Sequence, residues 1–172
     1  MGPIGAKAES VLMSETNIRI LKPSRKKPAA GEIFALQLAD EQYLFGRVIF
    51  SDLPADRAPM PGSYLIYIYD HVSPAKSPPL DQLRPDCLLL PPMFINRIPW
   101  TKGYFLTVGT QPLSAEDLMA QHCFRRWTGE YKDEHGHPIP APVEPCGDWA
   151  LASYRWLDDH ISDKLGFPRT PE

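Results

Sequence analysis

Cysteine is scarce in this 172-residue chain: the three thiols, at positions 87, 123 and 146, are far apart. No two of them have the two-residue spacing of a zinc ribbon or a thioredoxin-like site, which excludes both. Three cysteines cannot all pair within one chain, so we expect three reduced thiols in a reducing cytoplasm. Long apolar runs are also missing, and we therefore expect a soluble protein with neither a signal peptide nor a membrane span.

Charge of one sign is not in excess either. There are 18 basic and 21 acidic side chains, a net charge of −3, which argues against a dedicated nucleic-acid binder, because such proteins are strongly basic. The sequence contains no phosphate-binding loop, no dinucleotide glycine fingerprint, no Gly-x-Ser-x-Gly elbow and no His-Glu-x-x-His motif. We accordingly expect no enzyme and no cofactor.

Proline is abundant, with 20 residues in the chain. Because proline interrupts helices and central strands, this content predicts short strands and long, stiff loops rather than a helical bundle. A hydrophobic fraction of 43% is typical of a globular domain, and the length suits one such domain.

Two apolar segments, residues 32–38 and 43–50, flank a polar link and predict an antiparallel hairpin. Both segments are apolar at nearly every position, which indicates a sheet covered on both faces. Gly46 is typical of a bend or bulge where the sheet coils. Arg47, a lone charge in its strand, is expected to reach the sheet edge or to pair with a carboxylate.

Further strands are predicted over residues 63–70 and within 98–108, and a short buried segment over 87–90 is expected to stop at the following two prolines. Ser114 and Asp117 form a capping-box pattern at the start of a short helix. A longer amphipathic helix is predicted from Asp148 to Leu165, with Trp149 and Trp156 on one side of it and with Gly166 at its end. The resulting fold class is α+β: a strongly curved antiparallel β-sheet, or small half-barrel, covered by this C-terminal amphipathic helix.

Candidate chemistry is concentrated in one region, where soft nitrogen and sulfur ligands for zinc occur close together in sequence. They are His122, Cys123, His135, His137 and Cys146. Their spacing matches no common zinc site, so our main reading has no metal, with a metal-dependent hydrolase kept as a competing hypothesis. The adjacent carboxylates at 133–134 and 158–159 are sequential rather than opposed, which favours a solvated surface over an acid–base pair.

The residues Gly31-Glu32-Ile33-Phe34-Ala35 followed by Phe45-Gly46-Arg47-Val48 resemble the opening hairpin of the immunity protein 26 family, from bacterial polymorphic toxin systems. Trp100 with Gly103-Tyr104-Phe105, and the segment 131–136 before the C-terminal helix, are similar in order to the rest of that domain. The resemblance divides the chain into a flexible lead-in at 1–21, a single α+β domain at 22–166 and a short tail at 167–172.

This resemblance implies a protein that is not an enzyme and that binds and neutralises a cognate bacterial toxin by occluding its functional surface. The implied partner is a protein toxin, met in the cytoplasm. From the residues themselves, we expect the contact face around Trp127, Tyr131, Asp133 and Glu134, because exposed loops often carry function and because this one combines aromatic and charged side chains.

An alternative is a small curved β-barrel module that binds peptide or nucleic acid. It would use Arg47 and a basic stretch near the N-terminus, whose charged members are Arg19, Lys22, Arg25, Lys26 and Lys27. A solvated lead-in to the first strand is the simpler interpretation of this stretch, since the remainder of the chain is net acidic.

Overall fold

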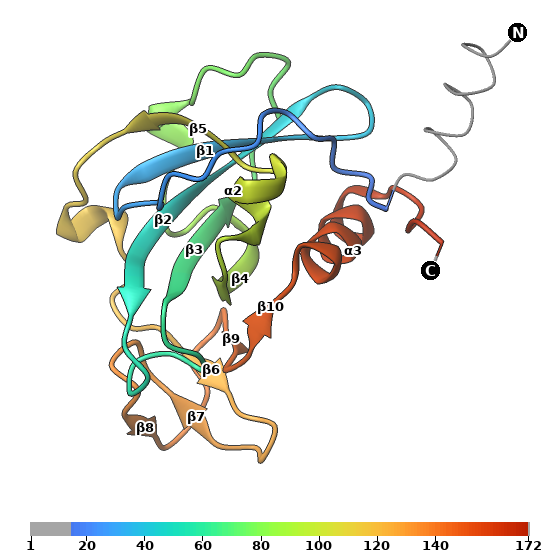
Figure 1. The fold of residues 1–172 in the computed structure, drawn as a ribbon. Helices are drawn as coiled ribbons and strands as arrows, with labels where there is room; N and C mark the ends of the chain where they lie inside the picture. Colours follow the sequence, from blue (N-terminus) through green and yellow to red (C-terminus); the bar gives the residue numbers. More distant parts are fainter. Residues whose placement is uncertain (1–14, 172) are drawn as a thin grey trace, which may run out of the picture.

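The computed structural model describes residues 15–171 and is built on a six-stranded sheet (Figure 1). The strand order is β10-β4-β3-β2-β1-β5, antiparallel except for the parallel pairing of β10 with β4. The strands are β1 (Glu32–Gln37), β2 (Tyr43–Leu53), β3 (Ser63–Tyr69), β4 (Leu88–Ile95), β5 (Leu106–Thr110) and β10 (Leu151–Ala152). This sheet with its helices confirms the α+β class.

The predicted first hairpin is confirmed as β1 and β2, and the third strand as β3. Phe34 lies opposite Gly46 in the register of β1 and β2. A side chain on Gly46 would collide with the Phe34 ring and would lie 2.7 Å from the Tyr67 carbonyl oxygen. Glycine is therefore required here because an aromatic ring crosses the neighbouring backbone.

Both faces of the large sheet are buried, as the continuous apolar strands predict. Alternate residues divide between two hydrophobic clusters, with Phe34 and Ile66 on one face and Ile33 and Tyr67 on the other. The first face is covered by α3 (Tyr154–Leu165) and α2 (Ile98–Lys102). The second lies beneath residues 113–124, so Tyr67 and Tyr69 of β3 are packed under a loop rather than displayed, while Tyr64 packs on the first face.

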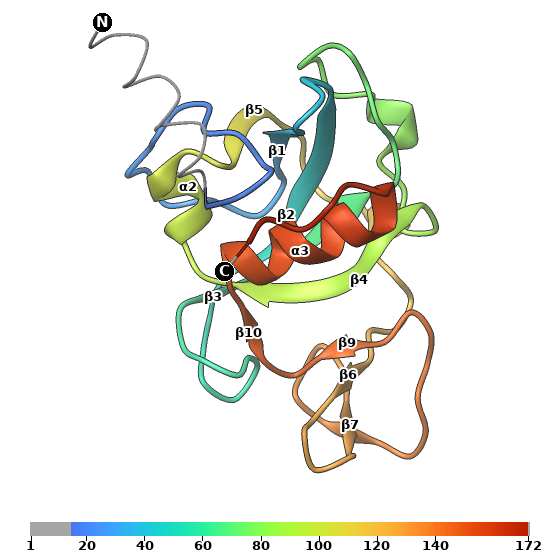
Figure 2. The same cartoon turned by 90° about the vertical axis from the view of Figure 1, so that its right-hand side faces the viewer.

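The helix α3 lies across the sheet alongside β4 (Figure 2). The predicted start at Asp148 is wrong: the helix begins after Ser153, whose hydroxyl accepts a hydrogen bond from the Trp156 N–H at 3.1 Å. Serine in this extended conformation is a strong N-cap, while Asp148 belongs to a strand and Trp149 packs on the opposite face of the sheet. The predicted end is confirmed, with Gly166 in the left-handed conformation.

A second, four-stranded sheet lies at one end of the molecule (Figure 1). Its order is β8-β7-β6-β9, with β6 and β9 parallel and the other pairs antiparallel. The strands are β6 (Phe124–Arg125), β7 (Tyr131–Lys132), β8 (Pro138–Ile139) and β9 (Gly147–Asp148). Phe124 anchors this sheet because its buried ring packs 4.5 Å, between centroids, from that of Phe94 in β4.

The prediction that Pro91 and Pro92 end a buried segment is also wrong, because β4 continues through both. The register between β3 and β4 shifts at this point, and β10 covers only Phe94 and Ile95 on the outer side. Proline is tolerated at such an irregular stretch, where β10 leaves the outer side of β4 unpaired. The strand predicted within residues 98–108 is β5, and the helix α2 occupies the start of that segment. The helix predicted at Ser114 is a single 3-10 turn, η2 (Ala115–Asp117), with the expected capping box.

The large sheet does not close into a barrel: β10 and β5 are its two edges. The half-barrel expected from the strand pattern therefore stays unconfirmed. Within residues 15–171, no helix combines the length and the apolar character needed to cross a bilayer.

The segment before β1 is attached to the rest of the fold. The Asp158 carboxylate on α3 accepts hydrogen bonds from the backbone N–H groups of Asn17 and Ile18, at 3.0 and 2.9 Å. Leu21 and Ser24 donate backbone hydrogen bonds to Gly103 and Trp100. The basic side chains of this stretch are exposed, while residues 1–14 of the predicted lead-in lie outside the described part of the chain.

Arg47 is buried, with 1% of its side chain exposed. It lies 3.3 Å from the Asp117 carboxylate and donates a 2.6 Å hydrogen bond to the Gln111 carbonyl. The predicted pairing with a carboxylate is thus confirmed. The same burial removes Arg47 from any nucleic-acid contact, contrary to the alternative reading of the sequence.

Candidate functional site

The most exposed aromatic side chain among the described residues stands on the hairpin of the small sheet. A turn from Arg126 to Gly129 joins β6 to β7, closed by a 2.9 Å hydrogen bond between their backbones. Trp127 occupies this turn and is 92% exposed. Since large aromatic side chains are normally packed, the turn displays an apolar surface that the fold itself does not use.

Charged side chains on both sides of Trp127 make contacts across the hairpin. Arg126 lies 3.4 Å from the Glu130 carboxylate across the turn, and the Arg125 guanidinium lies over the Tyr131 ring, 5.8 Å from its centroid. At this exposed position the ion pair and the cation–π contact each contribute on the order of 1 kcal/mol or less. We call residues 125–132 the β6–β7 hairpin; it carries both signs of charge around one exposed tryptophan.

The turn that follows is ordered by Asp133. Its carboxylate accepts backbone hydrogen bonds from His135 and His137, at 2.9 and 3.0 Å. Glu134 is 16% exposed in its side chain and directs its carboxylate toward His122, whose backbone N–H donates to it at 2.9 Å. The structure thus leaves Trp127 at the surface and Tyr131 and Asp133 half-buried, while Glu134 reaches into the protein.

His122, the residue that Glu134 contacts, is buried. The Tyr67 hydroxyl accepts a hydrogen bond from the Met119 N–H at 3.1 Å and lies 2.6 Å from His122 Nε2. The Glu134 carboxylate lies 3.4 Å from Nδ1 and can only accept, which places the imidazole proton on Nδ1. Nε2 then accepts from the Tyr67 hydroxyl. Burial lowers the pKa of His122 and raises that of Tyr67 to about 12, so both groups are uncharged at neutral pH.

The groups considered for zinc do not converge. Cys123 and Cys146 lie side by side, with sulfur atoms 2.6 Å apart, while His135 and His137 face each other on the exposed turn, 5.9 Å between ring centroids. In the part of the chain that the structure describes, no three histidine, cysteine or acidic side chains could hold a metal together. The hydrolase hypothesis therefore has no ligand set among these residues.

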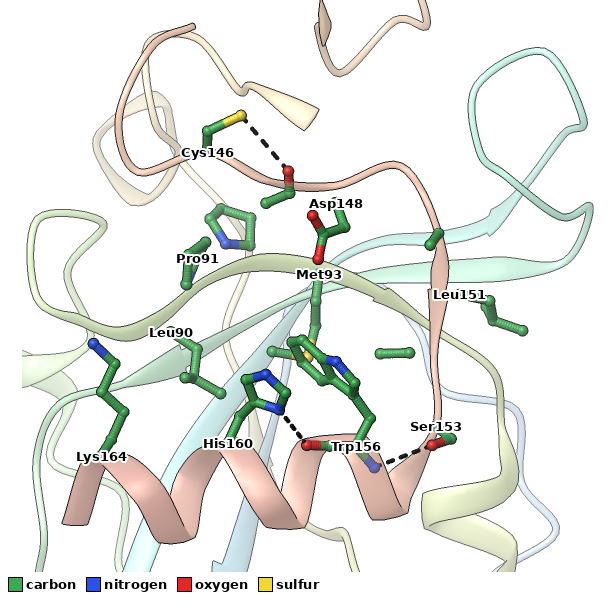
Figure 3. Close-up of a pocket in the computed structure, with 14 residues that line it drawn as sticks. Leu90, Pro91, Met93, Cys146, Asp148, Leu151, Ser153, Trp156, His160 and Lys164 are labelled. Carbon is green, nitrogen blue, oxygen red and sulfur yellow. Dashed lines mark hydrogen bonds between the residues drawn. The ribbon is translucent and has the colours of Figure 1, made fainter. Parts of the chain in front are cut away.

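A groove of about 430 Å³ runs between α3, β4 and residues 146–153. Trp156, His160 and Lys164 point into it from α3 (Figure 3). The rings of Trp156 and His160 stack 3.6 Å apart, and His160 Nδ1 lies 2.7 Å from the Trp156 carbonyl oxygen. The sequence did not predict this groove, because the segments that line it are far apart along the chain. The one local signal is the four-residue spacing of Trp156, His160 and Lys164, which places them on one face of a helix.

The described residues form a two-sheet α+β fold that displays an aromatic hairpin at one end and a groove beside α3. The family model described as Immunity protein 26 matches residues 29–133. Because this match spans more than half of the chain, the protein belongs to the immunity protein 26 family. The matched segment runs from β1 through β7, including Trp127 and Tyr131, and ends before α3. No curated protein and no solved structure matches the chain.

Proposed function

We propose that this chain is an immunity protein that binds a cognate protein toxin and neutralises it by covering the toxin's functional surface. Membership of the immunity protein 26 family supports this class of function. The single structural observation that carries the mode of action is Trp127, 92% exposed at the tip of the β6–β7 hairpin. We place the encounter in the bacterial cytoplasm.

The hairpin has the side chains that dominate protein–protein binding energy. Tryptophan, tyrosine and arginine are enriched at interface hot spots, and Trp127 is accompanied by Tyr131 and Arg125. In the bound state, Trp127 enters an apolar pocket of the toxin while Arg126 and Glu130 form the polar rim. The mixed rim selects partners by charge complementarity rather than by a general attraction to basic proteins.

The remaining proposed contact residues act at the base of the hairpin. Asp133 orders the turn beside Tyr131 through its two backbone hydrogen bonds. Glu134 is a positioning residue, because it connects this turn to His122 rather than to solvent. A specific interface needs about 800 Å² from each partner, so surfaces beside the hairpin also take part in the complex.

Neutralisation follows from occupancy alone in this proposal. A hairpin that projects from one end of the molecule (Figure 1) can fill a cleft of the toxin and exclude its substrate. No covalent step by this chain is required. The affinity and the slow dissociation of the complex then determine the protection.

The test is co-expression with the toxin encoded beside this gene, together with purification of the two proteins. We expect growth to be rescued, a stable one-to-one complex on size-exclusion chromatography, and loss of toxin activity in vitro when this chain is added. A catalytically inactive toxin variant serves as the control for binding without toxicity. Toxicity that persists at full expression of the folded chain, with no complex formed, would contradict the proposed function.

A further inference from the structure

Two of the three cysteines meet at the base of the small sheet. Cys123 immediately precedes β6 and Cys146 immediately precedes β9. These strands pair in parallel with Phe124 opposite Gly147, and the Gly147 N–H donates to the Cys123 carbonyl oxygen at 2.9 Å. The ladder therefore places the two cysteines in register, which explains why their sulfur atoms lie 2.6 Å apart although 23 positions separate them.

The surroundings of the two thiols differ in a way that sets an order of reaction. Cys123 is 1% exposed, whereas Cys146 is half-buried and lines the groove beside α3 (Figure 3). Cys146 is consequently the thiol that a reagent in the groove meets first. Cys87 takes no part, since its sulfur lies against the carbonyl oxygen of Asp70, at 3.7 Å.

We propose that Cys123 and Cys146 form a reversible intramolecular disulfide, which closes the ends of the segment that carries the β6–β7 hairpin. The oxidant is a low-molecular-weight disulfide such as oxidised glutathione. In a reducing compartment both thiols are free, and the bond forms when the ratio of oxidised to reduced glutathione rises. The inference concerns this chain alone and does not depend on toxin binding.

The chemistry is two successive thiol–disulfide exchanges. The Cys146 thiol loses its proton to water, its sulfur attacks one sulfur of the glutathione disulfide, and that disulfide breaks to release one glutathione thiolate. The Cys123 thiol then loses its proton and attacks the Cys146 sulfur, releasing the second glutathione. Two protein thiols are oxidised, one glutathione disulfide is reduced to two thiols, and the released thiolates take up the protons.

The structure also predicts slow kinetics. Burial, and then the neighbouring Cys123 thiol, raise the pKa of Cys146 to about 12. Since the thiolate is the nucleophile, little of the reactive form exists at neutral pH. The rate of disulfide formation should therefore increase about tenfold per pH unit in the alkaline range. The same bond, between Cys123 and Cys146, should form at every pH.

The test uses the full chain incubated in glutathione buffers that range from fully reduced to fully oxidised. Free thiols are then counted in denaturant, and we expect the count to fall from three to one. Tryptic mapping without reductant locates the bond, because cleavage at Arg125, Arg126 and Lys132 separates the Cys123 and Cys146 peptides unless they are bridged. The Cys87→Ser variant should still lose two thiols, whereas Cys146→Ser should lose none to an internal bond.

Thermal unfolding measures the consequence for the fold. Closing a segment of this length should raise the unfolding midpoint of the wild type by about 10 °C, with the increase absent in Cys146→Ser. A full set of free thiols after incubation in oxidised buffer, or bridged peptides from two different molecules, would overturn the proposal. An unchanged midpoint in protein whose bond has been mapped would overturn the stabilising role.

Discussion

The Tyr67 hydroxyl lies 2.6 Å from Nε2 of His122 and at the same time accepts the Met119 N–H. Because the Glu134 carboxylate faces Nδ1, Nε2 of the neutral imidazole is the acceptor and the Tyr67 hydroxyl is the donor. The Glu134 carboxylate, 3.4 Å from Nδ1, and the turn residues Asp133 and His135 are the other titratable groups that act on it. One buried imidazole thus connects the large sheet to the turn after the hairpin.

We predict that acidification destabilises the protein through His122. Burial lowers the pKa of folded His122 below its usual 6.5, so the unfolded chain binds the proton first as the pH falls, and stability is lost below about pH 6.5. Each unit of lowering corresponds to about 1.4 kcal/mol. Urea unfolding at about pH 7.5 and about pH 5.5 measures the loss.

The matched variants are His122→Gln, which cannot be protonated, and His137→Gln on the exposed turn. The first should lower stability at neutral pH but show a weaker decline on acidification. The second should behave as the wild type does. An equally steep decline in His122→Gln would assign the acid sensitivity to other groups.

Breaking the pair between Arg47 and Asp117 should be costly because the cation is buried. Hydrogen bonds from Ser114, and the nearby guanidinium, lower the pKa of Asp117 and keep it ionised. The substitution Asp117→Ala leaves Arg47 without its carboxylate and should cost about 2 kcal/mol, less than for a fully buried pair since Asp117 is partly exposed.

A double-mutant cycle separates the pair from the capping role of Asp117. In an Arg47→Met background, Asp117→Ala should cost only the cap, about 1 kcal/mol. Urea unfolding of the four proteins gives the coupling free energy directly. An equal cost in both backgrounds would mean that the pair contributes nothing.

The substitution Gly46→Ala should destabilise the fold by about 3 kcal/mol or more, because the new methyl group collides with the Phe34 ring and the Tyr67 backbone. Gly109→Ala is the control: its methyl group would meet only Pro78, at 3.9 Å, and should change stability by less than about 0.5 kcal/mol. Thermal unfolding of both variants distinguishes them. Similar midpoints would show that the Phe34 ring can move aside at little cost.

Replacing Trp127 with alanine should weaken toxin binding at least about 30-fold, the effect of losing one hot-spot side chain of about 2 kcal/mol. The unfolding midpoint should not change, since the ring is 92% exposed. Leu80→Ala is the control, because this side chain is also exposed (54%). It belongs to the 3-10 turn η1 (Leu80–Gln82), in the green part of the chain at the end of the molecule away from the small sheet (Figure 1). Titration calorimetry measures both, and equal affinities for the two variants would place the interface elsewhere.

The central strands and the end of α3 were predictable because local patterns decide them. Apolar residues at nearly every position of β1, β2 and β3 indicated burial of both faces, and Gly166 marked the end of the helix. The start of α3 could not be predicted, since Asp148 and Ser153 are both acceptable N-cap residues. The helix begins after Ser153 because the residues before it pair as strands, β9 with β6 and β10 with β4.

By itself, the sequence determined the class of the fold, the first hairpin and the family resemblance, since these depend on residue type and on spacing along the chain. Only the tertiary structure decided that Trp127 is displayed while Glu134 faces His122, that Cys123 lies against Cys146, and that α3 and β4 enclose a groove. Such relationships arise from contacts between segments distant along the chain, and no local pattern of side chains encodes which of those segments will meet.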